Sequence, residues 1–172
     1  MKAFILPLLA LFAPVALHAT VYTVSNNGYP AQYGTIDEGI NAASDGDTIY
    51  ISGSGTVYAA TTLSKSLTLI GETAFAPAGS FSATLSYLYL EPGAEYCHVV
   101  GLNFNSTVYV DCDNVVIERC KVDGYINVGG SDIRNGLVIR HCYLDMVYLN
   151  DMTNAIIANN VFVDNNYSYM IT

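Results

Sequence analysis

One short apolar line recurs four times in the second half of the chain. Each copy puts apolar or small residues at its first, fourth and sixth places, and the copies begin 18, 22 and 18 residues apart. This period is too short for a helical pair and long enough for one coil of short strands. We therefore expect a stacked parallel β-solenoid, in which outward side chains and loops carry function. The copies are residues 99–104, 117–122, 139–144 and 157–162.

Residues 1–19 have the pattern of a secretory signal peptide. One Lys precedes an apolar run, and the small residue Ala19 stands at the end. Pro7 and Pro14 interrupt the run, which is shorter than the ~20 residues of a membrane span. We predict cleavage after Ala19, and a single solenoid domain over residues 20–172 without a transmembrane segment. The mature protein is then secreted, either to a periplasm or to the extracellular space.

The mature chain is strongly acidic. The full sequence has 6 Lys and Arg against 15 Asp and Glu, a net charge of −9 at pH 7, and loss of Lys2 removes one further positive charge. Such a surface repels nucleic acid and anionic lipid, so neither is an expected partner. An acidic polysaccharide would need a cation or a local Arg cluster. Since Trp is absent, an aromatic contact with a sugar depends on Tyr.

A short helix is expected near the start of the mature chain. Thr35 and Glu38 have the spacing of a capping box, and Ile36, Ile40 and Ala43 share one face. We expect this helix to cover the open end of the first coil, which would otherwise expose core and strand edges. The sequence predicts neighbouring strands at residues 21–24, 48–51, 56–58, 66–71 and 84–90.

These segments resemble right-handed parallel β-helix proteins of the pectin-lyase-like superfamily. Residues 34–43, 45–51, 55–58 and 67–71 look like the N-terminal cap and first coils, and the later Ile-x-x-Cys-x-Val lines look like generic rungs. The resemblance implies an all-β right-handed parallel β-helix with a short N-terminal capping helix. It implies no single activity, since this scaffold carries lyases, hydrolases, esterases, epimerases, adhesins and other surface proteins.

Residues for carbohydrate catalysis are sparse. The strings Asn-Thr-Asp, Asp-Asp, Gly-His-Gly and Arg-Ile-Lys of polygalacturonase-like hydrolases do not occur, which argues against that chemistry. A lyase needs a strong base and a cation or second base at a uronate carboxylate. The candidates are Arg119, Lys121, Arg134, Arg140 and His141.

Two of these basic residues have acidic neighbours. Alignment of the rungs stacks Glu118 on Arg140, and the simplest interpretation is a surface ion pair worth less than ~1 kcal/mol. Arg134 follows Asp132 within the insertion of the longest rung, the most site-like loop of the chain. We expect no cofactor, and calcium is the one alternative. Its ligands would be Asp111 and Asp113, Asp123 and Asp145, or Asp132 and Asp151. Ordinary turn chemistry accounts for the same Asp residues.

An outward polar row is predicted on the second strand of each rung. The triplets Val-Tyr-Val, Ile-Asn-Val and Val-Tyr-Leu bury their flanking aliphatic residues and direct Tyr109, Asn127 and Tyr148 to the surface. Tyr rings beside an amide suit a sugar, whose C–H face packs on the ring while its hydroxyls bond to the amide. The alternative is a side-chain ladder that only stabilises the sheet.

The four cysteines carry no zinc pattern, because no Cys-x-x-Cys pair occurs. Cys120 and Cys142 take the same inward place in successive rungs, where stacked core thiols are expected. An exported chain also permits disulfides, and Cys97 with Cys112 is a second candidate pair.

The last rung is followed by no cap, so we expect either further coils beyond Thr172 or another chain at that end. The predicted function is a non-catalytic module that contacts a polysaccharide or cell-surface glycan or serves as an adhesin-like structural element. A polysaccharide lyase or other enzyme on pectate- or alginate-like polymers is the alternative. The candidate contact residues are Tyr109, Asn127, Tyr148, Arg134 and Arg140.

Overall fold

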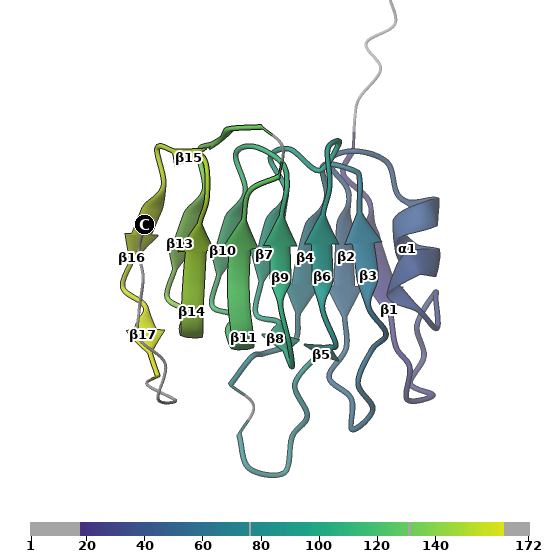
Figure 1. The fold of residues 1–172 in the computed structure, drawn as a ribbon. Coiled ribbons are helices and arrows are strands. Elements are labelled where there is room, and N and C mark those ends of the chain that lie inside the picture. Colours follow the sequence, from purple (N-terminus) through teal and green to yellow (C-terminus); the bar gives the residue numbers. More distant parts are fainter. Residues whose placement is uncertain (1–17, 76, 131, 164–172) are drawn as a thin grey trace, which may run out of the picture.

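The computed structural model describes residues 18–75, 77–130 and 132–163. They form an all-β parallel β-solenoid of about six turns with one short helix, which confirms the predicted fold class (Figure 1). In these three ranges, no helix is long and apolar enough to cross a membrane. The predicted signal peptide lies almost wholly outside the described residues, as does the chain after Val163, and both expectations about the ends stay predictions.

Two parallel sheets face each other across the core (Figure 1). Sheet A contains, in order, β1 (Val21–Val24), β2 (Thr48–Ile51), β4 (Thr68–Gly71), β7 (His98–Val100), β10 (Val116–Glu118), β13 (Val138–Arg140) and β16 (Ile156–Ala158). Sheet B contains β3 (Thr61–Leu63), β6 (Leu88–Leu90), β9 (Val108–Val110), β11 (Lys121–Val128), β14 (Tyr143–Leu149) and β17 (Val161–Phe162). Next to β11 lie β8 (Asn103–Phe104) and its partner β5 (Thr84–Leu85), and β12 (Arg134–Asn135) pairs with β15 (Met152–Thr153).

The recurring apolar line forms sheet A and the corner that follows it. Val99, Ile117 and Ile139 are in register and fully buried, as the spacing predicts. A residue with positive φ stands three places before each strand centre and another stands two places after it, so each of these coils turns at the same two points. The first set is Tyr96, Asn114, Gly136 and Asn154, and the second is Gly101, Arg119, His141 and Asn159.

Inward residues stack at the corner after sheet A. Cys120 and Cys142 are buried there as free thiols, which confirms the expected thiol stack, and Cys97 and Cys112 are also free and buried. Burial raises the pKa of Cys120, so it stays a neutral thiol. In the next coil Asn160 takes the corner place, and its amide bonds to the Cys142 N–H and the Ile139 carbonyl at 2.8 and 3.0 Å.

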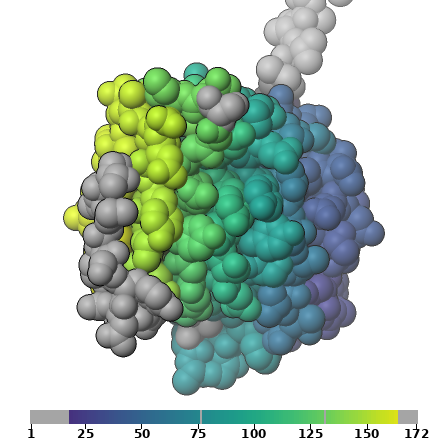
Figure 2. All heavy atoms as spheres, viewed as in Figure 1, coloured from purple at the N-terminus to yellow at the C-terminus, as the bar shows by residue number. Residues whose placement is uncertain are grey.

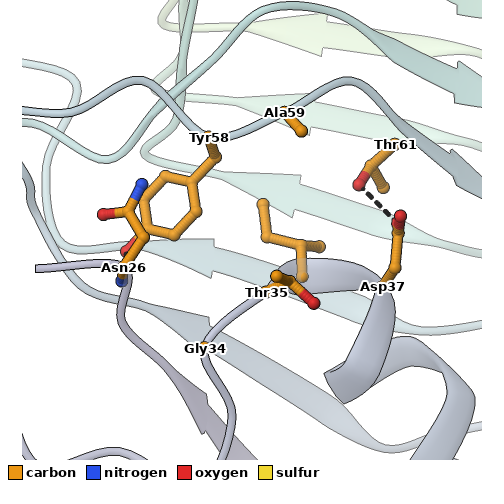
Figure 3. A pocket seen from close by; sticks show the side chains of 8 residues that line it. Asn26, Gly34, Thr35, Asp37, Tyr58, Ala59 and Thr61 are labelled. Carbon is orange, nitrogen blue, oxygen red and sulfur yellow. Dashed lines mark hydrogen bonds between the residues drawn. The ribbon is translucent and has the colours of Figure 1, made fainter. Parts of the chain in front are cut away.

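Helix α1 (Ile36–Ala42) caps the N-terminal end of the solenoid, as predicted (Figure 1). Thr35 and Glu38 form the expected capping box. Lys65 Nζ donates to the carbonyl oxygens of Ile40 and Ala43 at 2.7 Å, and so satisfies the end of the helix. A pocket of about 140 Å³ lies beside the start of the helix, and two of its lining residues are joined by a hydrogen bond from Thr61 Oγ1 to Asp37 Oδ1 at 2.7 Å (Figure 3).

Two strand predictions in the N-terminal half need correction. Residues 56–58 form no strand, because only Tyr58 bridges to a neighbour, Leu85; the strand β3 begins three residues later, at Thr61. The segment 84–90 is divided into β5 and β6, since the chain turns a corner at Ser86 and Tyr87. Both errors fall where the coils have irregular length.

Candidate functional site

The predicted outward row exists and is longer than the sequence indicated. Asn127 lies between Tyr109 and Tyr148 in the parallel register of β9, β11 and β14. Tyr89 on β6 extends the row by one coil, because it pairs with Tyr109. The flanking aliphatic residues are buried in β6, β9 and β11, so these four side chains point away from the core.

Five tyrosines form a continuous aromatic surface around this row. The rings of Tyr89 and Tyr109 stack with centroids 4.2 Å apart at an interplanar angle of 5°. Tyr125 packs edge-on between Tyr109 and Tyr148, with centroid distances of 6.4 and 5.4 Å. Tyr87 meets Tyr89 edge-on at 5.4 Å. We call these five residues with Asn127 the tyrosine surface; it belongs to the face turned to the reader in Figure 2.

Ring stacking limits which parts of the tyrosine surface a ligand can reach. Tyr89 and Tyr109 cover one ring face of each other, so these two faces are closed to a sugar. A hydrogen bond with Tyr125 and partial burial raise the pKa of Tyr109. Hydrogen bonds with Thr107 and Tyr109 lower the pKa of Tyr125. The hydroxyls are therefore already ordered relative to one another, and Asn150 Nδ2 contacts Asn127 Oδ1 at 3.5 Å beside them.

Sequence reasoning missed Tyr87, Tyr89 and Tyr125. Leu88-Tyr89-Leu90 has the same aliphatic–aromatic–aliphatic pattern as the β9 triplet, which was a sufficient signal for Tyr89. Tyr125 was harder to place. Between the pairs Val122–Leu144 and Tyr125–Met146, β11 has one residue more than β14, and this irregularity brings Tyr125 beside the row.

The structure adds a hydrogen-bonded partner for Arg134 that sequence reasoning missed. Its Nε and Nη2 donate to Asp111 Oδ1, one coil earlier, at 2.9 and 2.5 Å. The side chain is only 15% exposed, the residue belongs to the short strand β12, and Asp132 adds to the negative field around the guanidinium. A guanidinium that holds a carboxylate in this way has lost most of its capacity to act as a base.

Arg140 is paired as the rung alignment predicted. Its Nε and Nη2 donate to Glu118 Oε2 at 3.0 and 2.6 Å. The Glu118 side chain is 10% exposed, and Arg119 Nε and His98 Nε2 lie 3.4 and 3.5 Å from its oxygens. The hydrogen bond with Arg140 lowers the pKa of Glu118. This cluster lies on the outer side of sheet A, away from the tyrosine surface.

The suggested calcium ligands have other contacts. Asp111 accepts from Arg134, Asp113 accepts from the Asn135 N–H at 3.0 Å, and Asp123 pairs with Lys121. Within the described part of the chain, no three His, Cys, Asp or Glu side chains gather as a metal site would require.

Comparison of the chain with protein-family models, with curated proteins and with solved structures finds no match. The function of this chain must therefore be inferred from the surfaces of the solenoid itself. Of the five candidate contact residues, Tyr109, Asn127 and Tyr148 lie together, while Arg134 and Arg140 lie apart in separate ion pairs.

Proposed function

We propose that this protein is a non-catalytic, secreted module that contacts a glycan through the tyrosine surface. One observation carries the proposal: an outward row of aromatic and amide side chains runs without interruption over four successive coils. Phenol hydroxyls and an amide can donate to and accept from sugar hydroxyls, and an exposed ring face can pack on sugar C–H groups. No charge is needed for these contacts.

The geometry favours an extended polymer over a single sugar. Neighbouring parallel strands lie about 4.8 Å apart, so a chain along the solenoid axis would meet one side chain of the row at each coil. Each contact alone is weak, and several in series give useful affinity. The net charge of −9 favours a neutral polysaccharide over a polyuronate.

The test is binding of the mature protein to immobilised neutral and acidic polysaccharides. We expect retention on at least one neutral polymer and its loss in the Tyr109→Ala/Tyr148→Ala double variant. Tyr109→Phe/Tyr148→Phe keeps the rings and removes the hydroxyls, and so separates the two kinds of contact. The matched control is Tyr96→Ala, which removes a Tyr that is 73% exposed beside sheet A.

Retained binding in the double Ala variant would overturn the assignment of the surface. The competing proposal, a lyase on acidic polysaccharide, predicts a different result: unsaturated products from a polyuronate, lost in Arg140→Ala but not in the tyrosine variants. The mature protein should be assayed with and without calcium, because lyase chemistry needs a charge partner for the substrate carboxylate.

A further inference from the structure

An open groove lies beside sheet A, near the N-terminal cap. Its volume is about 690 Å³, and its walls are the turn that holds Tyr29 and Pro30 and the loop that ends at Phe81. Tyr50 on β2 and Glu72 after β4 also line it. The loop between β4 and β5 extends beyond the ends of the sheets (Figure 1). We call this cavity the aromatic groove.

Two aromatic side chains that line the groove are largely exposed to solvent. Tyr29 is 71% exposed and Phe81 is 61% exposed, although large apolar side chains gain most from burial. The Phe81 ring lies against the backbone of Gly55: a Cβ on Gly55 would be 3.2 Å from the ring, closer than most such contacts. A Cβ at Gly53 would overlap the Phe81 carbonyl. The two glycines therefore let the loop approach closely and present the ring.

A carboxylate completes the lining. Glu72 Oε2 accepts from the Gly53 N–H at 2.8 Å, which orients the group. Among the described residues that line the groove, Glu72 alone is charged. The strong negative charge of the whole chain reinforces its field and raises the local concentration of cations.

From these observations we infer that the aromatic groove binds an organic cation of the alkylammonium class. A quaternary or substituted ammonium is attracted to the faces of Tyr and Phe rings and to a carboxylate, and it is weakly hydrated compared with a metal ion. Anions are repelled by Glu72. The groove lies on the other sheet from the tyrosine surface, so this inference does not depend on the proposed glycan contact.

The test uses choline as the probe and its neutral isostere, in which a quaternary carbon replaces the nitrogen. Titration of the mature protein, followed by NMR chemical shifts, should show binding of choline that shifts amides around Gly53 and Phe81. We expect the isostere to bind at least about fivefold more weakly. Glu72→Gln, Tyr29→Ala and Phe81→Ala should each weaken choline binding by about twofold to fivefold.

Tyr96→Ala is again the control and should leave choline binding unchanged. The Gln variant keeps an acceptor for the Gly53 N–H, and an unchanged unfolding midpoint would show that its effect is on binding. Equal affinity for choline and the isostere would overturn the inference in favour of a merely apolar groove. Absence of shifts at millimolar choline would overturn it as well.

Discussion

The two halves of the solenoid are built differently. From Tyr96 to Phe162, each coil repeats one frame, with left-handed residues on either side of sheet A and identical inward positions in register. From Thr20 to Glu95, the coils vary in length, and hydrogen bonds from individual side chains hold the irregular segments together. Lys65 ties the helix end, Asp47 accepts from the Thr20 and Ser44 N–H groups, and Tyr58 Oη donates to the Ser52 carbonyl.

This difference separates two kinds of surface. A repeating frame places one outward residue above another, and so produces a row such as Tyr109, Asn127 and Tyr148. An irregular coil produces loops that enclose space, and the aromatic groove lies there. The repetitive half therefore suits an extended polymer, and the irregular half suits a compact ligand.

The largest predicted effect is in the repeating frame. Ile117 is fully buried at the centre of β10, so Ile117→Ala should destabilise the protein by about 2–5 kcal/mol. Val57 lies in the irregular half and is 44% exposed; Val57→Ala should change stability by about 0.5 kcal/mol or less. Urea unfolding measures both. A comparable loss of stability in Val57→Ala would show that residue 57 is packed as in a strand, and would contradict a start of β3 at Thr61.

The second prediction concerns a single contact of the irregular half. Lys65→Met keeps the aliphatic stem but removes the charge-assisted hydrogen bonds to the Ile40 and Ala43 carbonyls. We expect a loss of about 1.5–3 kcal/mol in the free energy of unfolding. Lys121→Met is the control, because it breaks only the partly exposed pair with Asp123 and should cost about 1 kcal/mol or less. Equal effects would show that the cap does not depend on Lys65.

The third prediction is the response to acid, which both halves share. Backbone hydrogen bonds from Thr20 and Ser44 lower the pKa of Asp47, and the bond with Arg140 lowers that of Glu118. A carboxyl with a lowered pKa stabilises the fold above its unfolded value, about 4, and this contribution is lost as pH falls through the folded pKa. Stability should therefore decrease below about pH 4.

Asp47→Asn and Glu118→Gln test this in each half. Each variant should be less stable than the unmodified protein at neutral pH, and the difference should shrink as the pH approaches about 3. Urea unfolding at a series of pH values measures it. A difference that stays constant with pH would mean that the lost contacts, and not the carboxylate charge, account for the effect.

The sequence predicts the repetitive half well because the information there is local. Alternation within one triplet fixes which side chain points outward, and the recurring apolar line fixes which triplets stack, so the row of Tyr109, Asn127 and Tyr148 could be placed in advance. Arg134 could not be placed, because its partner Asp111 lies 23 residues earlier across an insertion. The aromatic groove was also missed, since it depends on a loop that packs on Gly53 and Gly55.

The smallest predicted effect tests whether the frame itself sets the backbone at each corner. Arg119 has φ 53°, while the preceding coil has Gly101 at the same place. A left-handed residue with a Cβ costs about 1–2 kcal/mol, which glycine avoids, although glycine gains more entropy in the unfolded chain. Arg119→Gly should therefore be more stable than Arg119→Ala by about 1 kcal/mol. Both variants lose the exposed contact with Glu118 equally, so their difference in urea unfolding isolates the backbone. In an ordinary strand the order is reversed, and Ala more stable than Gly at this position would show that the corner is not imposed by the frame.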